Sequence, residues 1–208
     1  MNIREAYNDS LRRQGHVEDT AQLEIIGKLE DLQNRLAARR PASGGLAGLF
    51  KKRLEKQKTS VRGLYLWGGV GRGKTFLMDL FFETLPIKAK KRIHFHRMMR
   101  EVHNARKALG NVSDPLDKVA ANIARKTRVL CFDEFFVSDI GDAMILGRLL
   151  DGLFSRGVTL VATSNSKPDD LYRDGLQRRR FLPAIDSLNR HTEVLQLEGG
   201  VDYRLRLL

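Results

Sequence analysis

One stretch constrains the fold of this chain more than any other. Between Gly63 and Phe82, an apolar run with strand character leads into a glycine-rich turn, and the turn leads into a run with the pattern of a helix. The turn matches the pattern G-x-x-x-x-G-K-[ST] in the strand–turn–helix context that this motif, the P-loop, requires. Its residues are Gly68, Gly69, Val70, Gly71, Arg72, Gly73, Lys74 and Thr75.

The residue types in this turn suit a bound phosphate. Glycine permits backbone angles that a Cβ atom would forbid, so consecutive amides can converge on an anion at the start of a helix. Lys74 adds a positive charge for the β- and γ-phosphates of a nucleotide, and Thr75 offers a hydroxyl to Mg²⁺. The alternative, a glycine-rich turn with a surface lysine, leaves the strand and the helix on either side unexplained. ATP and Mg²⁺ are therefore the expected ligands.

Length and composition are those of a globular protein. The 208 residues suit one α/β domain, or one domain with an appendage, and 42% of them are hydrophobic, which is enough for a core. No apolar run approaches membrane-spanning length, and the first residues do not open a signal peptide. The single cysteine, Cys131, excludes an internal disulfide and fits a reducing cytosol. We expect a cytoplasmic protein in which Cys131 is buried.

The chain is strongly basic, with 37 Lys and Arg against 25 Asp and Glu and a formal net charge of +12. Such a charge suggests an acidic partner, for example nucleic acid, an anionic lipid surface or an acidic protein. However, the basic residues are spread rather than gathered in one block, which favours a solvated basic surface over direct nucleic-acid binding. The basic runs are 39–40, 51–53, 88–92 and 178–180.

A second apolar run, from Arg128 to Phe132, ends on two acids, Asp133 and Glu134. This pattern is typical of a buried parallel strand that delivers carboxylates to the carboxyl edge of a sheet. In a P-loop enzyme, an aspartate at this position holds Mg²⁺, usually through water, and the following glutamate is the base that polarises the attacking water. Two acids at the start of an ordinary loop are the alternative.

A third apolar run, 158–163, is followed by a polar tip that contains Asn165. We expect another buried strand beside the acidic one. In AAA+ ATPases, an asparagine at the tip of the strand next to the acidic strand senses the γ-phosphate and orients water. A turn-forming asparagine is the alternative.

The N-terminal part predicts helices. A short helix is expected within 1–15, and Asp19 or Thr20 is the expected cap of a surface helix whose apolar face includes Leu29 and Leu32. Gln22 lies in the first turn of this helix, where a glutamine amide can bind the adenine edge; a polar first-turn residue without that role is the alternative. A linker follows at 41–45. We therefore divide the chain into an N-terminal helical segment with a basic linker, 1–60, packing on the core, and a P-loop ATPase core, 61–208.

Two further groups are ambiguous. His94 and His96 are expected to share one face of a strand over 92–96, packed at its end rather than binding a metal. Three consecutive arginines, 178–180, cannot all point the same way, so at most one or two of them can reach the nucleotide of a neighbouring subunit. An arginine finger acting in trans and a solvated basic turn are both compatible with this run.

The order of these elements predicts an α/β P-loop fold of the AAA+ type, with a central parallel sheet of about five strands flanked by helices. Further helices are expected around Met99–Ala105, at Leu116–Arg125 and at 141–155, and a last strand at 192–197.

Four motifs resemble those of a known family, the ZapE cell-division ATPases and their mitochondrial AFG-one-like relatives. The motifs are the P-loop, the run 129–140, the segment 161–165 and the segment 175–185. The resemblance spans nearly the whole chain, and the long motifs are more specific than a P-loop alone.

The resemblance implies an ATPase of bacterial division that acts on FtsZ polymers at the constriction site in an ATP-dependent way. It assigns phosphate and Mg²⁺ to Lys74 and Thr75, the acidic pair to Asp133 and Glu134, and the sensor to Asn165. Either Arg178 or Arg180 is the finger candidate. Family members continue beyond the position of Leu208, so a C-terminal lid, which homo-oligomer assembly would need, is expected to be missing.

Three other functions are compatible with parts of the pattern. A helicase-loader-type ATPase that binds single-stranded nucleic acid is supported by the charge. A nucleotide-dependent adaptor would bind ATP without hydrolysing it. A kinase is less favoured, because the sequence offers no second phosphate-handling loop.

Overall fold

A five-stranded sheet forms the centre of the computed structural model, which describes residues 2–14, 18–39 and 60–198. Every pair of neighbouring strands runs parallel, and the strand order is β2-β3-β4-β1-β5. The strands are β1 (Gly63–Trp67), β2 (Lys90–His94), β3 (Val129–Asp133), β4 (Thr159–Ser164) and β5 (Thr192–Gln196). The predicted α/β fold with about five parallel strands is confirmed.

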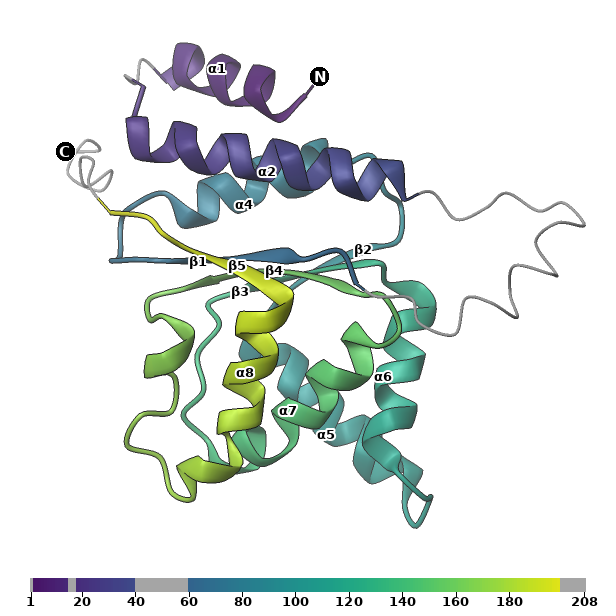
Figure 1. Ribbon diagram of the computed structural model, residues 1–208. Helices are drawn as coiled ribbons and strands as arrows, with labels where there is room; N and C mark the ends of the chain where they lie inside the picture. The colour runs from purple at the N-terminus through teal and green to yellow at the C-terminus, as the bar shows by residue number, and fades with distance from the viewer. Residues whose placement is uncertain (1, 15–17, 40–59, 199–208) are drawn as a thin grey trace, which may run out of the picture.

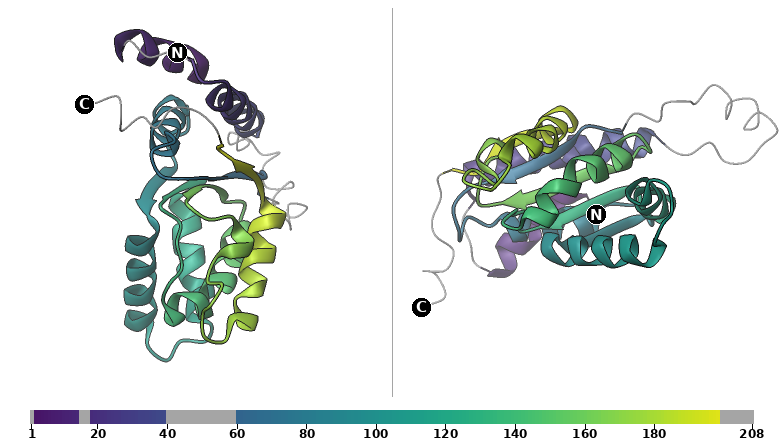
Figure 2. Two further views of the ribbon diagram at one scale, coloured as in Figure 1. Left: turned by 90° about the vertical axis from the view of Figure 1, so that its left-hand side faces the viewer. Right: turned by 90° about the horizontal axis from the view of Figure 1, so that it is seen from below.

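Helices cover both faces of this sheet, which gives three layers (Figures 1 and 2). One face carries α1 (Ile3–Gln14), α2 (Thr20–Ala38) and α4 (Lys74–Thr84). The other face carries α5 (Phe95–Leu109), α6 (Pro115–Lys126), α7 (Ile140–Phe154) and α8 (Leu182–His191). Two single turns of 3₁₀-helix, η1 (Pro168–Asp170) and η2 (Arg178–Arg180), precede α8.

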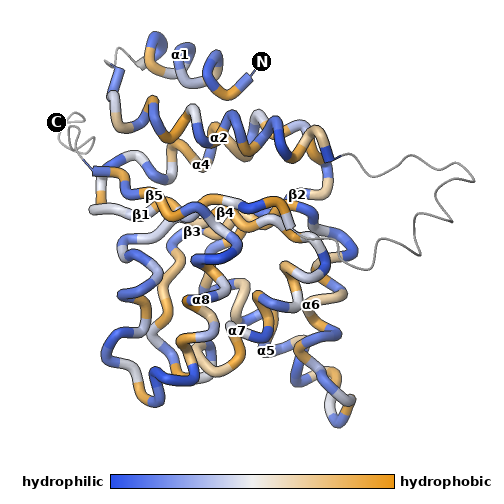
Figure 3. Tube along the Cα trace, viewed as in Figure 1, coloured by the Kyte–Doolittle hydropathy of each residue, from blue (hydrophilic) through white to orange (hydrophobic). Residues whose placement is uncertain are grey.

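The two faces of the sheet have separate hydrophobic cores, because successive residues of a strand point to opposite faces. In β3, Val129 and Cys131 belong to the core under α1, α2 and α4, whereas Leu130 and Phe132 belong to the core over α5–α8. Figure 3 shows hydrophobic residues along the strands between the two helical layers. Cys131 is buried, as predicted, and burial raises the pKa of its thiol to about 12.

The N-terminal helices pack on the P-loop helix rather than on the sheet alone. Asp19 caps α2 as predicted, since its side chain accepts hydrogen bonds from the backbone N–H groups of Ala21 and Gln22. Tyr7 of α1 meets Phe76 of α4 with 6.1 Å between ring centroids. The predicted linker at 41–45 and the whole basic segment after it, 46–58, lie outside the described residues, as do residues 199–208.

The prediction for the histidine strand was wrong by two residues. β2 ends at His94, and His96 lies in the first turn of α5 instead of on the strand. The helix begins at Phe95 because this side chain is buried against Phe132 and Phe135 of the core, with 5.6 and 4.4 Å between ring centroids. The two histidine rings still lie near each other, with centroids 5.9 Å apart.

Part of the basic run 88–92 does not face solvent, contrary to the expectation of a solvated surface. The Lys90 ammonium donates to the carbonyl oxygens of Phe82 and Leu85 at the carboxyl end of α4. A positive charge at this end of a helix interacts favourably with the helix dipole. Arg92 of the same run pairs with two carboxylates near the P-loop.

Candidate nucleotide-binding site

All five strands of the sheet are parallel and therefore end at the same edge. In the register of the sheet His94 lies opposite Asp133, and Trp67 lies opposite Ser164. The P-loop, the acidic pair and Asn165 each directly follow or end one of these strands, so the parallel arrangement gathers them at this edge. The turn from β1 into α4 marks the edge at the left of Figure 1. In open parallel sheets, this carboxyl edge is where ligands bind.

The P-loop has the backbone geometry that its sequence predicts. Gly71 and Gly73 have φ angles of 81° and 87°, in a region that residues with a Cβ atom rarely adopt. α4 begins at Lys74, directly after Gly73, so the first N–H groups of this helix have no partner within it. The Lys74 ammonium lies over the turn and donates to the carbonyl oxygens of Gly68 and Gly69, at 2.7 Å each. These groups suit a bound phosphate.

Gln22 joins α2 to the P-loop. Its side-chain nitrogen Nε2 lies 3.3 Å from the carbonyl oxygen of Arg72 and donates to it. The side chain is buried, and its Oε1 atom has no hydrogen-bond partner. A buried acceptor without a partner is uncommon, and here it lies beside a predicted ligand site.

Asp133 is largely buried and is held by an arginine from the neighbouring strand. Both of its carboxylate oxygens accept hydrogen bonds from Arg92, with Nε–Oδ2 at 2.7 Å and Nη2–Oδ1 at 3.2 Å. The third nitrogen of the same guanidinium, Nη1, donates to Asp79 of α4. Burial alone would lower the pKa of Arg92, but its hydrogen bonds to the carboxylates of Asp133 and Asp79, together with their negative charges, outweigh burial and raise the pKa.

Glu134 has very different surroundings from its neighbour. Its side chain is 76% exposed, and its Oε2 atom lies 3.7 Å from Nδ1 of His94. Its backbone adopts φ of 54°, an uncommon value for a residue with a side chain. The Glu134 N–H donates to the hydroxyl of Thr163 at 3.3 Å, which fixes this turn to the next strand.

Asn165 follows β4 and is exposed, as its predicted position at a strand tip requires. The backbone on either side of it is well held. The Ser164 hydroxyl donates to the Phe135 carbonyl at 2.7 Å, and the Tyr65 hydroxyl donates to the Ser166 carbonyl at 2.9 Å. Burial raises the pKa of Tyr65 above its usual value, so the phenol remains a donor.

The arginine run lies away from the P-loop of its own chain. η2 precedes α8 at the end of this helix that points away from the sheet (Figure 1). The Arg178 guanidinium donates to the Asp169 carbonyl, whereas Arg179 and Arg180 are exposed. The structure thus brings together the P-loop, Gln22, Asp133, Glu134 and Asn165, but not Arg178 or Arg180.

The structure places four residues at this site that the sequence analysis did not assign to it: Arg92, Asp79, His94 and Thr163. Arg92 carried one usable signal, a charged residue inside a strand pattern on the same face as His94. Asp79 follows Thr75 by four residues on the P-loop helix, a spacing that places the two on one side of the helix. Nothing in the sequence indicates which strand lies next to β2.

The site offers oxygen ligands of the kind that Mg²⁺ prefers, from Thr75 and Asp133. Within the described part of the chain, no cluster of three or more His, Cys, Asp or Glu could hold a metal by itself. Mg²⁺ is usually bound by one or two protein groups together with phosphates and water.

A parallel sheet, a P-loop that opens a helix and an acidic strand end define the class of P-loop nucleotide-binding proteins. The family model described as AFG1-like ATPase matches residues 1–208, and the chain belongs to that family. It is 51% identical over 97% of its length to the Cell division protein ZapE of Escherichia coli K12, of which it covers 56%. The chain thus spans little more than half the length of this relative.

Solved structures confirm the fold. The crystal structure of DnaI has a TM-score of 0.58 at 17% identity, with 90% of this chain and 87% of that chain covered. The DnaC helicase loader has a TM-score of 0.56 at 12% identity, with 88% and 93% covered. None of the helices in the described residues has both the length and the apolar character needed to cross a membrane.

Proposed function

We propose that this protein binds ATP with Mg²⁺ and hydrolyses it to ADP and phosphate, as an AAA+-like ATPase of cell division. The observation that carries the proposal is the convergence of the P-loop, the acidic pair and Asn165 at one edge of the sheet. The family, whose description is AFG1-like ATPase, supports the same activity.

In this proposal, the first N–H groups of α4 and the Lys74 ammonium bind the phosphates. Thr75 and Asp133 would hold Mg²⁺, which supplies positive charge against the phosphate oxygens during transfer to water. Glu134 accepts a proton from the attacking water, and Asn165 orients that water. The exposure of Glu134 suits this role, since its carboxylate can reach water and exchange protons with solvent.

The arginine finger would come from a second copy of the chain. η2 lies away from the P-loop of its own chain, so an arginine of this run cannot act on its own nucleotide without a large movement. Arg178 is partly held by the Asp169 carbonyl, which leaves the exposed Arg180 more accessible to a neighbour. We therefore propose a homo-oligomer in which Arg180 or Arg178 stabilises the charge on the transferred phosphoryl group.

We further propose that Gln22 contributes to adenine recognition. Its buried Oε1 acceptor lacks a partner and could accept a hydrogen bond from the N6 amino group of adenine. Its Nε2 donor already binds the P-loop, so the same side chain would couple base recognition to the phosphate-binding turn.

The experiment for hydrolysis is phosphate release by the Glu134→Gln variant. Loss of the base should slow turnover by about 10²–10⁴-fold while ATP binding is retained. Glu24→Gln, at an exposed position of α2, is the control and should turn over normally. Unchanged phosphate release by Glu134→Gln would exclude this residue as the base. A wild-type protein that binds ATP but releases no phosphate would instead be the nucleotide-dependent adaptor.

The partner is proposed from the relative alone. Because the E. coli protein is named for cell division, we propose that this chain acts in the cytoplasm on the division machinery. FtsZ polymers, which the family resemblance implies, are the proposed substrate. ATPase rate and oligomer size should both change when FtsZ polymers are added. A rate that depends on neither protein concentration nor FtsZ would contradict both the partner and the shared active site.

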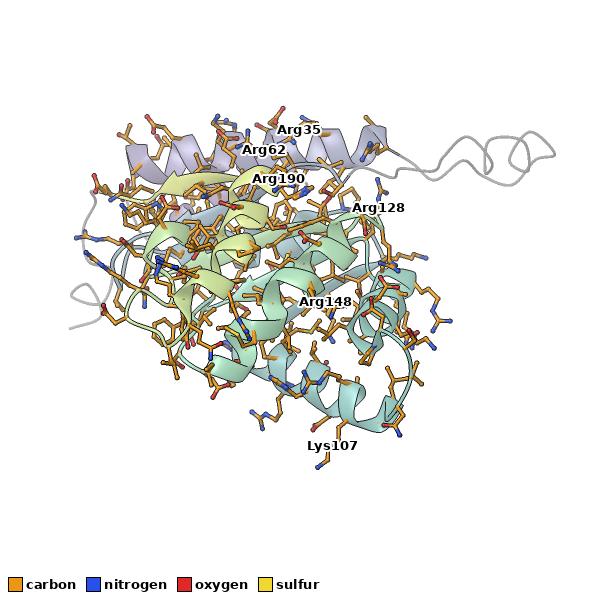
Figure 4. The ribbon with its side chains drawn as sticks, turned by 60° about the horizontal axis from the view of Figure 1, so that its bottom comes forward. Arg35, Arg62, Lys107, Arg128, Arg148 and Arg190 are labelled. Carbon is orange, nitrogen blue, oxygen red and sulfur yellow. The ribbon has the colours of Figure 1, made fainter. Side chains whose placement is uncertain are left out.

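Single-stranded nucleic acid is the second candidate partner, favoured by the net charge of +12. Six basic residues labelled in Figure 4 are spread from the top to the bottom of that view: Arg35, Arg62, Lys107, Arg128, Arg148 and Arg190. Several of them already have partners. Arg128 donates to the Leu36 carbonyl at 2.6 Å, and Arg148 pairs with Asp114 at 2.7 Å. This distribution favours the protein partner.

The nucleic-acid alternative is tested with a labelled oligonucleotide. Binding that weakens steeply as salt rises would support it, because phosphate contacts release counterions. No binding at low salt would remove it.

A further inference from the structure

Three charged side chains meet on the face of the sheet that α4 covers. They come from three elements: Arg92 from β2, Asp133 from the end of β3 and Asp79 from α4. One guanidinium binds both carboxylates, two of its nitrogens donating to Asp133 and the third to Asp79. We call these three residues the Arg92 cluster.

The position of the cluster follows from strand pairing. Arg92 lies opposite Cys131, and His94 lies opposite Asp133, so alternate residues of β2 and β3 share one face. Cys131 belongs to the core under α4, which identifies that face as the one next to the P-loop helix. Asp79 follows Thr75 by one helical turn, so the cluster adjoins the residue expected to bind Mg²⁺.

The charges in the cluster do not cancel. Two carboxylates share one guanidinium, which leaves the cluster with one negative charge. The side chains of Arg92 and Asp133 are only 21% and 11% exposed, and that of Asp79 is 45% exposed. Without the guanidinium, the two aspartates would lose the cation that both of them bind. Oxygen atoms from two carboxylates are a common binding arrangement for a divalent cation.

Arg92 does not block Asp133 completely. A carboxylate has about four lone-pair positions, and the two hydrogen bonds from Arg92 use one on each oxygen. The remaining positions can accept hydrogen bonds from water bound to a metal ion. The guanidinium thus fixes the orientation of the carboxylate and leaves it able to act through water.

We propose that Arg92 is a positioning residue that fixes Asp133 for the nucleotide-bound Mg²⁺ and prevents Asp79 and Asp133 from binding a divalent cation before nucleotide arrives. The proposal rests on the proposed function for its nucleotide step. Its cation step concerns only the nucleotide-free protein. In this proposal, the carboxyl edge of the sheet binds a divalent cation only together with the phosphates of a bound nucleotide.

The experiment is a Mn²⁺ titration of the nucleotide-free full chain, followed by the electron paramagnetic resonance signal of free Mn²⁺. Arg92→Gln removes the counterion and should bind Mn²⁺ at least about tenfold more tightly than wild type. Mg²⁺ should also raise its thermal unfolding midpoint. The double variant Arg92→Gln/Asp79→Asn should lose the gain, and the control Arg97→Gln, at a 71% exposed arginine, should match wild type.

Arg92→Lys provides a second, independent test. Lysine keeps the charge but cannot donate to both oxygens of Asp133 in the same geometry. It should therefore leave nucleotide-free Mn²⁺ binding unchanged and raise the Mg²⁺ concentration for half-maximal ATP binding about 10–100-fold, without affecting Mg²⁺-free nucleotide affinity.

The outcomes separate this proposal from the proposed function. A folded Arg92→Gln variant with wild-type Mn²⁺ affinity overturns the cation step, whether or not the protein hydrolyses ATP. If Arg92→Gln does not fold, the Mg²⁺ requirement of Arg92→Lys decides, and an unchanged requirement overturns the proposal. Failure of the proposed function would appear separately, as a wild-type protein that releases no phosphate.

Discussion

Asp133 and Glu134 are adjacent in the chain but lie in two parts of the site with opposite surroundings. The inner half, formed by Asp79, Arg92 and Asp133, lies between the sheet and α4, and its Asp133 side chain is 11% exposed. The outer half, formed by His94, Glu134 and Asn165, is open, and the Glu134 side chain is 76% exposed. The difference arises where β3 ends, because Glu134 adopts a left-handed backbone conformation and turns away from the sheet.

This difference matches two chemical tasks. A carboxylate that orients a metal-bound water must be held still, and in the inner half the pairing of the buried Asp133 with Arg92 provides that rigidity. A general base must contact water and exchange its proton, which the outer half permits. The comparison therefore predicts that changes in the inner half alter the Mg²⁺ requirement, whereas changes in the outer half alter turnover.

The largest expected effect concerns the residues directly after Glu134. Phe135 is fully buried against Phe95, with ring centroids 4.4 Å apart, whereas Phe136 is 62% exposed. Phe135→Ala should lower the free energy of unfolding by about 3–5 kcal/mol, because it leaves a cavity in the core. Phe136→Ala, the matched control, should change it by less than about 0.5 kcal/mol. Urea unfolding measures both, and similar losses would show that the turn is not anchored through Phe135.

A smaller effect is expected at Lys74, which belongs to neither half. Lys74→Ala should weaken ATP binding about 10–100-fold, the equivalent of one charged hydrogen bond, with little change in unfolding free energy. Lys88→Ala, at an exposed lysine, is the control for charge. Isothermal titration calorimetry measures both affinities. If Glu134→Gln weakens ATP binding as much as Lys74→Ala does, the outer half does not act on turnover alone, and the assignment of separate tasks to the two halves is wrong.

The sequence predicted those parts of the site that depend on local pattern. A P-loop between a strand and a helix, two acids at the end of an apolar run and a cap at Asp19 are each encoded within a few residues. Even the parallel sheet follows from the alternation of strands and helices.

The Arg92 cluster could not be predicted in the same way. Asp79 lies 13 positions before Arg92, and Asp133 lies 41 positions after it. Contact between Arg92 and Asp133 requires β2 to lie next to β3. That strand order depends on packing across the whole sheet. The exposure of Glu134 likewise depends on its own left-handed backbone conformation, which no sequence pattern predicted.

The smallest expected effect tests the link between Glu134 and the sheet. Thr163→Val removes the hydroxyl that accepts the Glu134 N–H, and should lower the free energy of unfolding by about 1 kcal/mol. Because Glu134 then loses its own hydrogen bond to β4, while Phe135 keeps those to the Thr163 carbonyl and the Ser164 hydroxyl, turnover should fall while ATP affinity is retained. Phosphate release and urea unfolding measure the two effects.

β4 also supplies a closely matched control for this change. Thr159 is equally buried, but its hydroxyl has no hydrogen-bond partner. Thr159→Val removes an unpaired polar atom and should leave stability unchanged or raise it, with normal turnover. If the two variants behave alike, the Thr163 hydroxyl does not hold Glu134, and the position of the outer half must then depend on the burial of Phe135 and its hydrogen bonds to the Thr163 carbonyl and the Ser164 hydroxyl.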